Sequence, residues 1–161
     1  TLFALFAGIY HWFPKVTGRK MSEFLGKLHF WPSLLFINGV FMPMFFQGLA
    51  GVSRRLYDPT QYAHALPTQP LNVFMSISAW LLALAQIPFV VNFFGSLFFG
   101  KRVDRNPWQA TTLEWLAPSP PPHGNFAKPQ TVVCGPYEFS VPGMKKDWRM
   151  QTEPIGGKKH A

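Results

Sequence analysis

Apolar residues without charge gather in three runs along the first two thirds of the chain. Residues 1–14, 29–53 and 71–100 contain no Asp, Glu, Lys or Arg. A helix needs about 20 residues to cross the hydrocarbon core of a bilayer. The second and third runs are long enough, and we expect spanning helices over residues 22–50 and 71–100. The first run predicts a partial helix, the last half of a span whose start is missing.

Prolines and amides interrupt both long runs. Pro32 and Pro43 lie in the second run, and Gln86, Pro88 and Asn92 lie in the third. Proline is tolerated in a membrane helix where neighbouring helices satisfy the freed carbonyls. The amides indicate hydrogen bonds between helices, with water for proton transfer as the alternative. The predicted fold class is therefore all-α and transmembrane, as part of a packed multi-helix bundle.

The chain changes character after residue 100. A basic segment over residues 101–105 ends the third run, and residues 118–122 read Pro-Ser-Pro-Pro-Pro, which is typical of a stiff extended segment. We expect a transmembrane region over residues 1–100 and an irregular C-terminal arm over residues 101–161. The proline run is interpreted as a rigid spacer, with a docking ligand for another protein as the alternative.

Composition supports a membrane chain with a polar tail. Hydrophobic residues make up 48% of the chain, and 17 of its residues are Phe, yet the mean hydropathy is only +0.06. Phe41 and Phe45 belong to a set that either packs against lipid and helices or lines a cofactor envelope. One cysteine, Cys134, excludes an internal disulfide and a Cys-rich metal site.

The charge pattern predicts the orientation of the chain. The formal net charge is +8, which in a soluble protein suggests nucleic acid. Here the cations flank the apolar runs, and we expect no nucleic-acid partner. One predicted membrane face carries seven basic residues: Lys15, Arg19, Lys20, Lys27, Lys101, Arg102 and Arg105. Positive charge collects on the cytoplasmic or matrix side, so we expect the C-terminal arm there.

Two adjacent arginines stand on the opposite face. Arg54 and Arg55 follow the second apolar run, on the side where positive charge is disfavoured. They are either snorkelling side chains that reach lipid phosphate or water, or a pair that clamps a di-anionic ligand. Arginine suits the second role because its guanidinium stays charged and grips a carboxylate through two parallel hydrogen bonds.

Seven segments follow one another in a set order and spacing: residues 8–15, 25–31, 41–43, 48–55, 106–108, 112–115 and 118–122. Together they resemble subunit I of the haem–copper respiratory oxidases, with a cytochrome c oxidase favoured. The chain would run from the end of the tenth helix to the C-terminus. Residues 8–15 resemble the end of the tenth helix and residues 25–31 the start of the eleventh. The end of the eleventh helix, the loop beyond it and the segment after the twelfth helix are matched by residues 41–43, 48–55, 106–108, 112–115 and 118–122.

The resemblance implies part of the catalytic subunit of a proton-pumping terminal oxidase that transfers electrons from cytochrome c to oxygen and forms water. It implies haem a, a high-spin haem and copper in the complex, with the metal-ligand histidines upstream of Thr1. We therefore expect no metal ligand and no catalytic residue in this chain. The implied partners are the remainder of subunit I, subunits II and III, cytochrome c and the lipid bilayer.

The resemblance also gives Arg54 and Arg55 a role. Adjacent arginines after the eleventh helix bind the haem propionates in this family, which supplies the anion that the charge pattern requires. Phe45 stands where relatives often have His, and Val52-Ser53 stand where they often have Met-Pro. The membrane would be a bacterial plasma membrane or a mitochondrial inner membrane. A quinol oxidase subunit I of the same superfamily and a non-catalytic membrane subunit remain alternatives.

Overall fold

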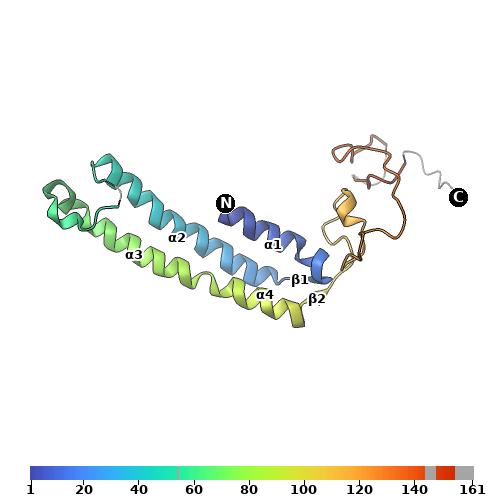
Figure 1. Ribbon diagram of the computed structural model, residues 1–161, viewed down its shortest axis with the longest axis horizontal. Coiled ribbons are helices and arrows are strands. Elements are labelled where there is room, and N and C mark those ends of the chain that lie inside the picture. The colour runs from blue at the N-terminus through green and yellow to red at the C-terminus, as the bar shows by residue number, and fades with distance from the viewer. Residues whose placement is uncertain (54, 144–147, 155–161) are drawn as a thin grey trace. The chain divides into compact units, whose positions relative to one another are not determined.

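A computed structural model describes residues 1–53, 55–143 and 148–154. The chain divides into two compact units, one of residues 1–21 with 96–161 and one of residues 22–95. The elements, in chain order, are α1 (Leu2–Thr17), β1 (Arg19–Lys20), α2 (Glu23–Leu49), the 3-10 helices η1 (Pro59–Gln61) and η2 (Ala63–Thr68), α3 (Gln69–Leu84), α4 (Ile87–Phe99), β2 (Lys101–Arg102) and the 3-10 helix η3 (Leu113–Trp115) (Figure 1).

Helix α2 is the longest element of the second unit. It begins after Ser22, whose hydroxyl accepts a hydrogen bond from the backbone N–H of Leu25 at 3.5 Å, and Glu23 places negative charge in its first turn. Its 27 residues give a length of about 40 Å, enough to cross a bilayer. Among the described residues, Glu23–Leu49 and Ala63–Phe99 are long and apolar enough to span a membrane.

The segment predicted as one helix over residues 71–100 differs in the structure. It consists of α3 and α4, which are separated at Ala85 and Gln86. Pro88 lacks an N–H and its ring hinders the carbonyl of Leu84, the last residue of α3. Regular bonding resumes where the N–H of Val90 donates to the carbonyl of Gln86 at 3.1 Å. Proline therefore interrupts the regular helix here, within the candidate span Ala63–Phe99.

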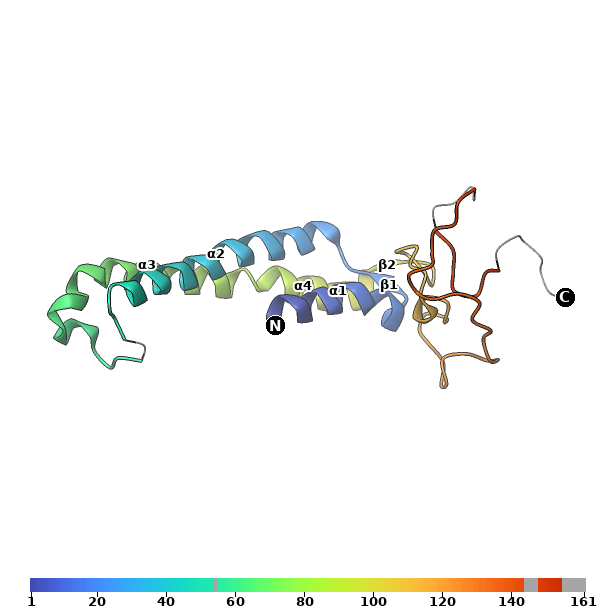
Figure 2. The same cartoon turned by 90° about the horizontal axis from the view of Figure 1, so that it is seen from above.

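Helices α2 and α3 lie side by side along their length (Figure 1 and Figure 2). At the break, Gln86 reaches across to α2. Its Oε1 lies 3.0 Å from His29 Nε2, and its Nε2 donates to Ser33 Oγ at 3.0 Å. His29 and Ser33 are both buried. The prediction that Gln86 bonds to a neighbouring helix is confirmed.

Two further amides, Asn92 and Gln47, link α2 or the residue before it to α4 and α3. Asn92 of α4 accepts from the backbone N–H of Ser22 at 2.8 Å and donates to the Ser22 carbonyl at 2.9 Å. Towards the other end, Gln47 Nε2 donates to Asn72 Oδ1 at 2.8 Å. Amide side chains thus join the hairpin at its two ends and at the helix break, which satisfies polar groups that lipid would penalise.

Helices α2 and α3 approach closely at Gly39. A Cβ at this position would lie 2.6 Å from Ser78 Oγ and 3.0 Å from Ser78 Cβ. We expect Gly39→Ala to destabilise the helix pair by about 1–3 kcal/mol, because the added methyl overpacks the contact. Thermal inactivation of the native complex would measure the loss.

Gly95→Ala is a matched control for this prediction. Gly95 lies inside α4, outside the contact between α2 and α3, and a Cβ there would meet nothing within 4 Å. Both substitutions gain the same helix propensity, so the difference between them isolates the contact with Ser78. Equal stability of the two variants would show that α2 and α3 do not pack at Gly39 as described.

The first unit contains α1, the short ladder β1–β2 and the described part of the arm. Helix α1 continues past Pro14 to Thr17 and ends at Gly18, which adopts the left-handed conformation (φ 69°) and donates to the carbonyl of Pro14 at 2.8 Å. Strands β1 and β2 are antiparallel, with Arg19 opposite Arg102 and Lys20 opposite Lys101.

One buried lysine ties the arm to α1. Lys15 Nζ donates to the carbonyls of Ala117 at 2.6 Å and Arg105 at 2.9 Å, and it lies 5.2 Å from the ring centroid of Trp115. Trp115 is only 1% exposed. The first part of the arm thus has a fixed place against α1 within this unit.

Candidate functional site

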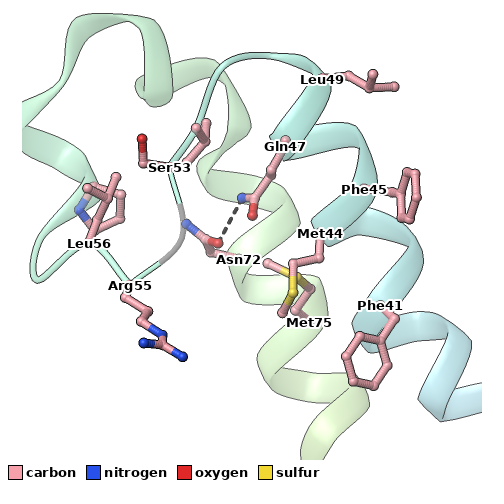
Figure 3. A pocket seen from close by; sticks show the side chains of 13 residues that line it. Phe41, Met44, Phe45, Gln47, Leu49, Ser53, Arg55, Leu56, Asn72 and Met75 are labelled. Atoms are coloured by element: carbon pink, nitrogen blue, oxygen red, sulfur yellow. Dashed lines mark hydrogen bonds between the residues drawn. The ribbon is translucent and has the colours of Figure 1, made fainter.

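A cavity of about 870 Å³ lies in the second unit where α2 ends. Its wall combines the last turns of α2, the loop that follows and the first turns of α3. Figure 3 shows the loop on one side and α2 on the other. The lining residues are Phe41, Met44, Phe45, Gln47, Gly48, Leu49, Val52, Ser53, Arg55, Leu56, Pro59, Asn72 and Met75.

A hydrogen-bonded amide pair fixes one wall of the cavity. Gln47 Nε2 donates to Asn72 Oδ1 (Figure 3). It also donates to the carbonyl of Thr68 at 3.2 Å, and Asn72 Nδ2 donates to Gln69 Oε1 at 3.0 Å. Gln47 is buried. Because these amides bond to each other and to nearby groups, they hold the end of α2 against the start of α3.

The chain turns sharply between α2 and the cavity loop. Gly51 adopts φ 83°, and the N–H of Val52 donates back to the carbonyl of Gln47 at 3.0 Å. Arg55 then has φ 63°, a conformation that is uncommon for a residue other than glycine and that gathers at functional sites. The turn brings this arginine to the cavity.

The structure places only one of the two predicted propionate ligands. Arg55 is exposed and lines the cavity, while Arg54 lies outside the described residues. Within the described ranges, no carboxylate forms an ion pair with Arg55. Its guanidinium therefore presents a positive charge to whatever occupies the cavity.

Asp58, the acidic residue nearest to Arg55 along the loop, bonds to residues of the helix η1 that follows it. Asp58 accepts hydrogen bonds from Thr60 Oγ1 at 2.6 Å, from the Thr60 N–H at 2.9 Å and from Gln61 Nε2 at 3.4 Å. The side-chain bond from Thr60, followed by the backbone bond, lowers the pKa of Asp58 below its ordinary value. Asp58 thus stays ionised as the cap of η1.

The lining defines the chemistry that the cavity accepts. Phe41, Met44, Leu56 and Met75 supply apolar surface, and Arg55 supplies a cation. Binding cavities in proteins typically combine apolar walls with a few polar groups that fix orientation. This arrangement suits an amphipathic ligand that has an apolar body and a carboxylate, and arginine can hold that carboxylate through two parallel bonds.

The sequence alone did not point to the α3 side of this cavity. Asn72 and Met75 lie on a different helix from Phe41 and Met44, and no local pattern says which residues of α3 face the end of α2. The available signal was polarity: Gln47 and Asn72 are amides within otherwise apolar segments.

Two histidines of the described chain take part in contacts between segments. His11 stacks on Trp108 with ring centroids 5.9 Å apart and meets Trp115 edge-on at 5.0 Å. His29 bonds to Gln86. Among the described residues, no three His, Cys, Asp or Glu side chains gather as a metal site.

The fold and the cavity together define a helical protein with two segments long and apolar enough to span a membrane and a loop whose Arg55 lines a cavity. Residues 1–81 match the family model described as Cytochrome C and Quinol oxidase polypeptide I. The chain belongs to this family. The predicted family and the all-α transmembrane fold class are confirmed, and the protein is a membrane protein.

Three relatives agree with this assignment. The chain is 50% identical over 86% of its length to the cytochrome c oxidase subunit 1 of Synechocystis sp. and 43% identical over 88% to that of Thermostichus vulcanus. It is 42% identical over 95% to the alternative cytochrome c oxidase subunit 1 of Bradyrhizobium diazoefficiens. The chain spans about a quarter of the length of each of these relatives.

Proposed function

We propose that this chain is the C-terminal part of subunit I of a haem–copper terminal oxidase that transfers electrons from cytochrome c to oxygen. The family description covers cytochrome c and quinol oxidases alike. The three relatives above carry cytochrome c oxidase in their names, which favours cytochrome c over quinol as the electron donor.

Within this assembly, Arg54 and Arg55 would hold the propionates of the haems. The observation that carries this proposal is the position of Arg55, an exposed arginine at positive φ that lines a largely apolar cavity. Buried carboxylates without partners are costly, and a guanidinium offsets that cost. The cavity therefore fits the carboxylate-bearing edge of a haem, whose iron would supply the electron-transfer chemistry.

The residues of this chain act on the haems by position and charge. The amide pair Gln47–Asn72 fixes the cavity wall, and the turn at Gly51 presents Arg55. A fixed positive charge close to a haem favours its reduced state, so the arginine pair would raise the haem potentials. The copper and both haem irons would be ligated by other parts of the subunit.

The same proposal fixes partners and orientation. The spanning helices would pack with the remainder of subunit I, and through it with subunits II and III, in a bacterial plasma membrane or mitochondrial inner membrane. The C-terminal arm would lie on the cytoplasmic or matrix side. The arm follows the basic residues of β1 and β2, and positive charge collects on that side of a membrane.

A reduced-minus-oxidised visible spectrum of the native complex that co-purifies with this chain tests the function. We expect haem a bands, with a part that shifts on addition of carbon monoxide, because a terminal oxidase keeps one haem open to diatomic ligands. Turnover with reduced cytochrome c and with a quinol, measured on the same sample, separates the two donors. A complex that contains no haem would overturn the proposal.

A further inference from the structure

The ladder of β1 and β2 brings four cations together. Arg19 lies opposite Arg102, and Lys20 lies opposite Lys101. Directly opposed residues of an antiparallel pair share one face of the ladder with Cβ atoms about 4.5–5.5 Å apart, and like charges in such pairs are destabilising. Each face of this ladder thus carries a like-charge pair, a pattern that calls for an anion.

Backbone bonds hold the ladder in place despite this repulsion. The N–H of Val103 donates to the carbonyl of Gly18 at 3.2 Å, and Arg19 Nη1 donates to the carbonyl of Gly100 at 2.8 Å. The left-handed Gly18 at the end of α1 turns the chain into β1. These bonds therefore hold the backbone of the two strands, from which the cations project.

The two strands differ in how far their side chains are occupied. Arg19 bonds to Gly100, and Lys20 Nζ lies 4.8 Å from the ring centroid of Trp108. Lys101 and Arg102 are exposed, and within the described part of the chain their side chains make no hydrogen bond or ion pair. Of the four cations, these two are therefore the ones available to bind a ligand.

An apolar surface adjoins the cations. Strand β2 begins two residues after the end of α4 and of the candidate span Ala63–Phe99. The last two residues of that helix, Phe98 and Phe99, are 69% and 90% exposed. Exposed aromatic side chains thus lie next to exposed cations, as they do where the acyl chains of a bilayer meet the headgroups.

We propose that the β1–β2 ladder is a binding site for an anionic phospholipid. Lys101 and Arg102, which lie on opposite faces of the ladder, reach the headgroup phosphate from its two sides along the outer edge of β2, and Phe98 and Phe99 lie against the acyl chains. The charge supports a lipid that carries a net negative charge, such as phosphatidylglycerol, over a zwitterionic one. Asp104 is the sole acidic residue between residues 96 and 113, so the segment itself supplies little neutralisation. The proposal needs only the membrane location of the chain and is independent of the haem site.

The test uses the native membrane complex that contains this chain, depleted of lipid in mild detergent. Binding of short-chain phosphatidylglycerol and phosphatidylcholine is titrated and followed by native mass spectrometry. We expect Lys101→Gln with Arg102→Gln to weaken phosphatidylglycerol binding by about 30-fold. Each cation near an anionic lipid contributes about 5-fold in affinity, and the two contributions multiply. Phosphatidylcholine binding should hardly change.

A charge-preserving variant controls for folding of the ladder. Lys101→Arg with Arg102→Lys keeps both cations and should bind phosphatidylglycerol nearly as well as the parent. Equal phosphatidylglycerol binding by the Gln variant and the parent would overturn the proposal. So would displacement of the lipid by millimolar inorganic phosphate, which would indicate a free-anion site. Loss of a protein subunit from the Gln variant without a change in lipid binding would assign the ladder to an acidic protein partner instead.

Discussion

Replacing Arg55 by Met is expected to lower the midpoint potential of the nearest haem by about 90 mV. A unit charge about 8 Å from the haem interacts with the transferred electron by about 2 kcal/mol at an effective dielectric constant of 20, which corresponds to about 90 mV for one electron. The sign follows because loss of a positive charge disfavours the reduced state. Redox titration of the native complex, followed at the haem bands, measures this shift.

Two variants separate charge from structure in this experiment. Arg55→Lys keeps the charge and loses the parallel pair of hydrogen bonds, so its potential should stay closer to that of the parent. Arg105→Met removes an exposed cation from the arm, outside the cavity, and should leave the potential unchanged. An unchanged potential in Arg55→Met would remove this residue from the propionate site, and Arg54→Met would then test its neighbour.

Replacing Lys15 by Met is expected to release the first part of the arm from α1. The substitution leaves the carbonyls of Ala117 and Arg105 without their donor, and each buried unsatisfied group costs about 1–3 kcal/mol. The two groups together cost about 2–6 kcal/mol, and we expect this loss of stability to speed amide exchange in residues 105–117. Hydrogen exchange of the native complex, read by mass spectrometry of peptides, measures the change.

Lys128→Met is the matched control for the arm. Lys128 is exposed on the same arm, so the same change of side chain should leave exchange near the parent level. Faster exchange confined to peptides around Trp115 in Lys15→Met would support the anchor. Identical exchange in both variants would show that the arm is held by other contacts.

The pattern of charge-free runs predicts segments that are long enough to span a membrane, and it was insufficient for their internal detail. The length of a run decides whether it can cross a bilayer, and α2 covers Glu23–Leu49. The break between α3 and α4 depends on how Pro88 and Gln86 act together, and a hydrophobic run contains no such information. Lys15 was interpreted only as a topological charge, because its acceptors lie 90 and 102 residues further along the chain.

The candidate site shows a similar division. Adjacency of two arginines on the charge-poor side indicated an anionic partner, and Arg55 does line a cavity. The shape of that cavity depends on Asn72 and Met75, whose position against the end of α2 follows from helix packing. Packing between distant segments is set by close contacts such as Gly39 with Ser78, and these are visible only once the two helices are side by side.

The three amide links between α2 and its partner helices also determine how far along each other these helices lie. Gln47 pairs with Asn72, Gln86 with His29 and Ser33, and Asn92 with the backbone of Ser22. A slip of one helix along the other by a single turn would break all three links at once, in surroundings where water offers no replacement. The hairpin thus has a single alignment in which all of these amides are paired, and this alignment fixes the register of α2 against α3 and α4.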